Sequence, residues 1–114
     1  MIIVSNKEII NILANLLTKA IKSLYDTHLI YIASDYTNWS IKFYGVSLNN
    51  QILVEATFES IDKQLKILLK EYGLEKLIIS DIKSDHMLLK INHENITEEE
   101  FDKYITLCKF YGFC

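Results

Sequence analysis

Apolar and polar residues alternate along two stretches in the first half of the chain, and this alternation limits the possible folds more than any other feature. The apolar members are Trp39, Ile41 and Phe43 in the first stretch, and Ile52, Val54, Ala56 and Phe58 in the second. A period of two is typical of a β-strand with one buried face. We therefore expect two strands whose apolar residues share that face.

A third strand is expected immediately before them. Residues 29–33 are apolar at every position, which favours a strand inside the sheet. Turn-forming residues separate the three runs, among them Asp35, Asn38 and the pair Asn49 and Asn50. Residues 28–58 are thus predicted to form a three-stranded meander.

A helix is predicted before the meander, over residues 6–25. Ser5 and Glu8 have the spacing of a capping box at its start, and Asp26 and Thr27 break the pattern at its end. Its apolar residues cover an arc of roughly 220° at about 100° per residue, which is wider than one sheet face requires. Either a second helix of the same chain covers the remainder, or the helix carries a self-association surface.

Three further elements and the last helix complete the prediction. Ser60 and Gly73 are suitable ends for a second helix, and residues 77–82 and 86–92 are predicted to form a hairpin. Thr97 and Glu100 form a second capping box, which begins a final helix with an apolar stripe. The stripe consists of Phe101, Tyr104, Ile105, Cys108 and Tyr111. Phe110 lies off it.

These elements predict a single α+β domain, residues 1–114, with three helices and a five-stranded mixed, mostly antiparallel sheet in the order α-β-β-β-α-β-β-α. A crossover helix lets the fourth strand lie parallel to the first, which gives the strand order 3-2-1-4-5. The chain contains no proline and only three glycines, so short connections are expected.

Charge and cysteine content exclude several classes of function. The net charge is −3, and every basic residue other than histidine is a lysine, so nucleic-acid binding is not expected. Cys108 and Cys114 are the only cysteines and form no disulfide framework. Together with the lack of a membrane-span-length apolar run, this predicts a reduced, cytoplasmic protein without a membrane partner.

The residues of known catalytic and cofactor sites do not gather in the sequence. The glycines are isolated from one another, so no phosphate loop is present. His86 and His93 are too few and wrongly spaced for a metal site. Ser80, Asp81, Ser84, Asp85 and His86 contain the residue types of a hydrolytic triad, but turns collect serine and aspartate for local hydrogen bonds. We assign no catalytic residue, cofactor or metal, and expect a protein that is not an enzyme.

An acidic cluster at the start of the last helix is the densest charge feature. It comprises Glu94, Glu98, Glu99 and Asp102, with the capping residue Glu100 among them. Acidic residues there stabilise the helix dipole, but they also create a field that attracts a basic protein. The cluster therefore either serves only to cap the helix or forms a protein interface, and the interface is the site hypothesis that we carry forward.

By elimination, the favoured hypothesis is a small inhibitor of the immunity type that covers a basic toxin or nuclease, with a possible homodimer through the first helix. An alternative is a regulatory module that binds a small molecule on the open sheet face, where Lys42, Tyr44, Glu55 and Thr57 are expected. A third, less favoured hypothesis is nucleic-acid binding with Tyr44 stacked on a base. No motif in the chain resembles a known family.

Overall fold

The computed structural model describes residues 4–22, 29–45 and 51–114, and only the backbone of residues 29–32, 45 and 51–57. Within these residues the helices are α1 (Asn6–Lys22), α2 (Gln51–Glu71) and α3 (Glu98–Phe110). The strands are β1 (Leu29–Asp35), β2 (Ser40–Gly45), β3 (Ile78–Ile82) and β4 (Met87–Ile91). The chain is therefore an α+β domain. The expected ends of the first helix at residues 23–27 and the turn at Asn49 and Asn50 lie outside the described residues.

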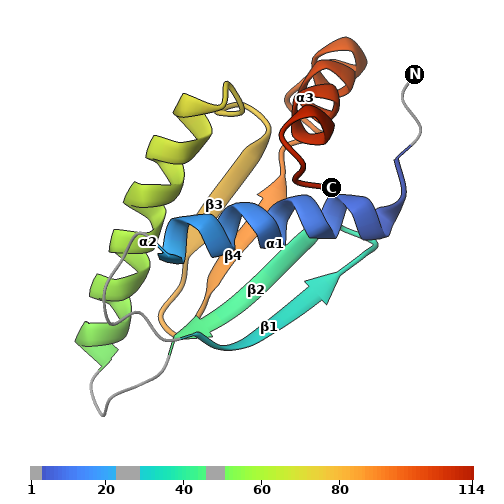
Figure 1. Cartoon of the computed structure of the whole chain (residues 1–114). Coiled ribbons are helices and arrows are strands. Elements are labelled where there is room, and N and C mark those ends of the chain that lie inside the picture. Colours follow the sequence, from blue (N-terminus) through green and yellow to red (C-terminus); the bar gives the residue numbers. More distant parts are fainter. Residues whose placement is uncertain (1–3, 23–28, 46–50) are drawn as a thin grey trace.

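The four described strands form one antiparallel sheet in the order β1-β2-β4-β3, as Figure 1 shows. Helices α1 and α2 cover one face of this sheet. The core lies between the two layers, where Phe43 of β2 meets Phe58 of α2 edge to face with ring centroids 5.8 Å apart. Ile41 and Phe43 are buried as the alternating pattern predicted.

The expected strand over residues 52–58 is wrong, because these residues form the first turns of α2. Their apolar positions also fit a helix. Val54, Phe58, Ile61, Leu65 and Leu68 follow one another at steps of four and three residues, which is the spacing of one helix face. No proline or glycine interrupts this pattern, so one continuous helix forms in place of a strand that ends at Phe58 and a helix that begins at Ser60.

The five-stranded sheet and its order 3-2-1-4-5 are corrected for the same reason. Without the expected third strand, β2 pairs with β4, and Ile41 lies opposite Leu89. The pairing is antiparallel, whereas we expected a parallel central pair. The two outer strands are β1 and β3, so the expectation that residues 29–33 form an inner strand is also wrong.

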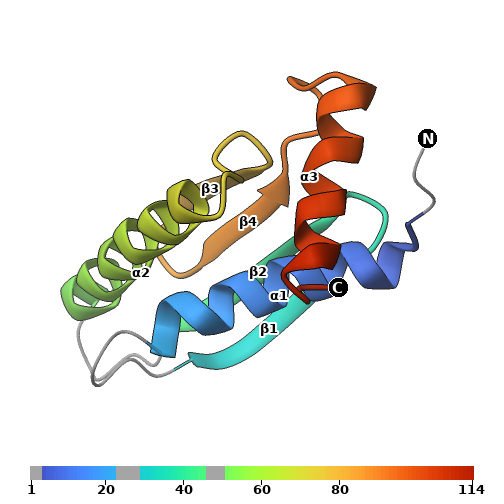
Figure 2. The same cartoon turned by 45° about the horizontal axis from the view of Figure 1, so that its top comes forward.

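The described part of the apolar arc of α1 is covered within the chain. Its buried residues run around the helix from Ile12 to Ile10, an arc of roughly 160° at about 100° per residue. The sheet, α2 and the end of α3 share this contact, and Figure 2 shows the C-terminal turn of α3 beside α1. The Asn15 side-chain amide donates to the Phe113 carbonyl at 2.7 Å, which fixes the tail on α1. This part of the arc therefore needs no second copy to bury it, and the rest of the expected arc, Leu24 and Tyr25, lies outside the described residues.

Three predicted helix ends have the expected geometry, whereas Ser60, the expected start of the second helix, lies inside α2. The Glu8 N–H donates to the Ser5 hydroxyl at 3.1 Å, and the Glu100 N–H donates to the Thr97 hydroxyl at the same distance. Gly73 has a φ of +71° and ends α2, and the buried Leu74 donates its N–H to the Leu69 carbonyl at 2.8 Å.

Trp39 lies in the turn before β2 rather than in the strand, with a φ of +49°. Its indole N–H donates to the Asn6 side chain at 2.9 Å, and its ring stacks on Phe101 with centroids 5.6 Å apart. These contacts join the β1–β2 turn to both α1 and α3. They explain why a half-buried tryptophan stands at a turn position.

Candidate protein-binding surface

Helix α3 is attached to the domain by one narrow stripe and exposes the opposite one. The buried side chains of this 13-residue helix are Tyr104, Ile105 and Cys108. Glu99, Lys103, Thr106 and Phe110 follow one another at steps of four, three and four residues and are all half-buried or exposed. At about 100° per residue they fall within a stripe of roughly 60° on the outer side. We call these four residues the outer stripe.

The acidic residues lie at the N-terminal end of this helix. Glu94, Glu98 and Glu99 are exposed, and Asp102 is half-buried. Glu100 has a separate role, because its carboxylate accepts the Thr97 backbone N–H, and this bond lowers the pKa of Glu100. Within the part of the chain that the structure describes, Glu94, Glu98 and Glu99 form no ion pair. Their charge is therefore available to a partner.

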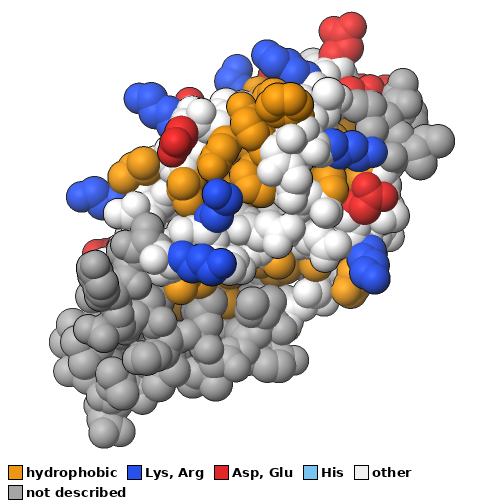
Figure 3. Space-filling view, viewed as in Figure 1, with side chains coloured by type: hydrophobic (Ala, Val, Ile, Leu, Met, Phe, Trp, Pro, Cys, Tyr) orange, Lys and Arg blue, Asp and Glu red, His pale blue; other side chains and the backbone are white. Residues whose placement is uncertain are grey.

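An aromatic cluster occupies the other end of α3, and its members are Tyr72, Phe110, Tyr111 and Phe113. Phe113 is buried, whereas Phe110 is 81% exposed and Tyr111 is 41% exposed. Lys19 places its ammonium 5.6 Å from the centre of the Tyr72 ring. Figure 3 shows hydrophobic side chains gathered between the ends of α2 and α3, with lysines around them. This apolar patch is the kind of surface that marks protein contacts.

The sheet face proposed for a small ligand does not assemble as expected. Lys42 is exposed and Tyr44 is half-buried on the face opposite the helices, where the Tyr44 ring lies 5.6 Å from that of His86. Glu55 and Thr57 belong to α2, not to a strand, so they are not on this face. The four residues therefore do not form one strand-borne site.

The residue types of a triad separate into two hydrogen bonds, one between β3 and α2 and one between chain neighbours. The Ser80 hydroxyl donates to Asp62 on α2, so it does not approach the imidazole of His86. His86 Nδ1 instead lies 2.7 Å from the carboxylate of its chain neighbour Asp85, and this contact lowers the pKa of Asp85. The Asp85–His86 contact fits the interpretation of this segment as turn chemistry. Ser80 instead lies in β3, and its bond joins this strand to α2.

The cysteines and histidines do not form a reactive centre among the described residues. Cys108 is buried on the α3 stripe, and burial raises the pKa of its thiol to about 12. His93 packs edge to face on Trp39 at 5.6 Å. Across residues 4–22, 29–45 and 51–114, no group of three metal-ligating side chains comes together. In those same ranges, no helix has the length and hydrophobicity to cross a bilayer.

Sequence reasoning missed a groove between α2 and the edge strand β3. It has a volume of about 610 Å³ and is lined by Leu65, Lys66, Leu69, Lys70, Glu75, Lys76, Ile78, Ile79, Ser80 and Asn92. The lysines at steps of four along α2 were visible in the sequence. The position of β3 at the edge of the sheet was not visible, because it depends on the strand order, which the sequence did not predict.

Comparison of the chain with protein families, with curated proteins and with solved structures finds no match.

Proposed function

We propose that this protein acts by binding another protein, as a small inhibitor that covers a basic partner with the outer stripe of α3. The observation that carries the proposal is the 81% exposed Phe110 on a helix whose other end bears Glu98 and Glu99. A phenylalanine exposed to this extent is costly in water unless a partner covers it, and aromatic residues dominate the binding energy of protein interfaces.

The two ends of the stripe lie close enough together for one interface to include both. Glu99 and Phe110 are 11 positions apart, or about 16 Å at about 1.5 Å per residue. A standard interface covers about 800 Å² on each partner, a patch wide enough to include both. In this arrangement the glutamates accelerate the encounter with a cationic surface, and Phe110 slows dissociation.

The first experiment identifies the partner and locates its binding surface. The immobilised protein is incubated with lysate of its source cells, in parallel with Phe110→Ala and with Ile67→Ala. Ile67 is a matched control, because it is 51% exposed on α2 and distant in sequence from the stripe. We expect a basic protein on the wild type and on Ile67→Ala, and its loss on Phe110→Ala.

Association kinetics with that purified partner then test the acidic end. Replacing Glu98 and Glu99 by lysine should slow association at low salt and flatten its salt dependence, because charges at the rim act mainly on the encounter rate. Glu100 is retained, since its loss would break the capping box. Equal association of the double variant and the wild type at low salt, with equal capture by Phe110→Ala, would refute the proposal.

A further inference from the structure

The outer edge of β3 carries backbone groups that the sheet does not use. At the two ends of the β3–β4 ladder, the Leu77 carbonyl accepts from Asn92 at 2.7 Å and the Lys83 N–H donates to His86 at 2.8 Å. Bonded positions alternate along an antiparallel ladder, so odd-numbered residues of β3 bond to β4. The N–H and carbonyl groups of Ile78, Ser80 and Ile82 therefore point away from the sheet.

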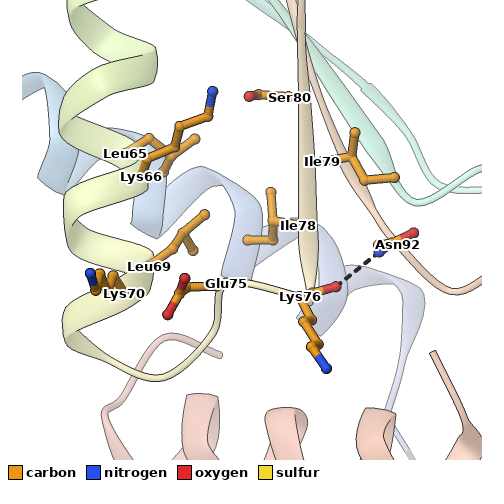
Figure 4. Close-up of a pocket in the computed structure, with 10 residues that line it drawn as sticks. All are labelled: Leu65, Lys66, Leu69, Lys70, Glu75, Lys76, Ile78, Ile79, Ser80 and Asn92. Atoms are coloured by element: carbon orange, nitrogen blue, oxygen red, sulfur yellow. Dashed lines mark hydrogen bonds between the residues drawn. The ribbon is translucent and has the colours of Figure 1, made fainter. Parts of the chain in front are cut away.

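These outward groups line the groove between α2 and β3. Figure 4 shows Leu65 and Leu69 directed from α2 toward the strand, with Ile78 directed back toward them. Ile79 lies on the other side of the strand and is 40% exposed. A chain segment placed beside β3 would thus find apolar contacts on both of its faces.

The charges around the groove favour an acidic chain segment beside β3. Lys66, Lys70 and Lys76 line it and Glu75 is its one acidic lining residue. Lys66 is paired with Asp62 at 2.8 Å, and Asp62 also accepts from Ser80, so the charge of Lys66 is neutralised within the chain. Lys70 and Lys76 form no ion pair within the described ranges of the chain. The open part of the groove is therefore positive.

We propose that β3 and this groove bind an extended, acidic segment of a partner polypeptide, which adds to the sheet as a fifth strand. Such a strand would bond to the outward groups of Ile78, Ser80 and Ile82. Every second side chain would be apolar and would pack on Ile79 on the face away from α2. Its acidic residues would face Lys70 and Lys76. This surface is separate from the outer stripe of α3, so it stands or falls independently of the inhibitor proposal.

The test uses the full chain and a synthetic peptide in which glutamate and valine alternate. The peptide has about six residues, which is a typical strand length. The control is a peptide of the same length in which lysine replaces glutamate. Binding is followed by NMR of the isotope-labelled protein. We expect saturable chemical-shift changes confined to β3 and α2, and slower amide exchange at Ser80 and Ile82. The protein should bind the glutamate–valine peptide at least about tenfold more tightly than the lysine–valine peptide. Lys70→Glu should reduce binding of the acidic peptide, whereas Lys63→Glu, on the same helix outside the groove, should not.

Two variants of one residue test the backbone bonding. Ser80→Pro removes an outward N–H without breaking a bond to β4, and proline is tolerated on edge strands at such positions. Ser80→Ala loses the same hydroxyl bond to Asp62 but keeps the N–H. We expect Ser80→Pro to abolish peptide binding and Ser80→Ala to retain it, with folding of both checked by circular dichroism.

Several outcomes would overturn this proposal. They are absence of saturable binding at millimolar peptide, equal binding of the acidic and basic peptides, and equal binding by the two Ser80 variants. A wild-type dimer that Ser80→Pro dissociates would also overturn it, because the edge would then belong to a second copy of the chain.

Discussion

Truncation of isoleucines at the two borders of the α1 arc tests whether that arc is buried within one chain. Ile10 and Ile12 lie at opposite borders and are 5% and 0% exposed. Replacement by alanine removes three carbon atoms, worth about 2.4 kcal/mol at about 0.8 kcal/mol per buried CH₂. The cavity left behind adds to this loss, so we expect each variant to lose about 2–5 kcal/mol of unfolding free energy.

The assay is urea unfolding followed by circular dichroism at two protein concentrations about a hundredfold apart. For a monomer the midpoint does not depend on concentration, and both variants should shift it equally at the two concentrations. Thr18→Ala is the control on the exposed side of α1 and should change stability by less than about 0.5 kcal/mol.

A concentration-dependent midpoint in the wild type that disappears in Ile10→Ala or Ile12→Ala would refute this reasoning. It would mean that part of the arc is buried against a second copy, as in the homodimer that the sequence alone left open. A loss below about 1 kcal/mol in both variants would also contradict the packing described for α1.

Two further predictions concern the helix ends and the buried thiol. Gly73→Ala and Gly112→Ala should each destabilise the protein by about 1–2 kcal/mol in urea unfolding, because both glycines have positive φ while no atom lies within 4 Å of an added Cβ. A neutral result at both sites would mean that these turns relax. The folded-state pKa of Cys108 is raised above its ordinary value of 9.0 to about 12, so its contribution to stability is complete below pH 9 and is lost as pH rises toward 12. As pH rises between these values, the unfolding free energy of Cys108→Ala should fall less than that of the wild type. In the native protein, the exposed Cys114 should react with iodoacetamide before the buried Cys108. Identical pH profiles for the variant and the wild type would contradict the burial argument.

The sequence by itself determined the starts of α1 and α3, the end of α2, the β1–β2 and β3–β4 hairpins and most of the core. Ser5, Thr97 and Gly73 act within a few residues of their own position, so their patterns can be interpreted without knowing the fold. The same holds for the alternation of Ile41 and Phe43, because side-chain direction along a strand is set by local backbone geometry.

Candidate sites were predicted less completely than the helix ends. The exposure of Phe110 followed from its position off the apolar stripe, and the acidic turn was visible as a run of charges. The groove was not visible, because its lining comes from a helix and a strand that are neighbours only in the folded chain.

The tertiary structure alone decided between strand and helix over residues 52–58 and fixed the order of the strands. Val54 and Phe58 satisfy both a period of two and a step of four, so local pattern does not separate the two structures. Continuation of the helical spacing to Leu65 and contact of Phe58 with Phe43 favour the helix. Strand order depends on contacts between residues distant in the chain, such as Ile41 with Leu89, and only the packing of α1 and α2 on one face selects among the possible pairings.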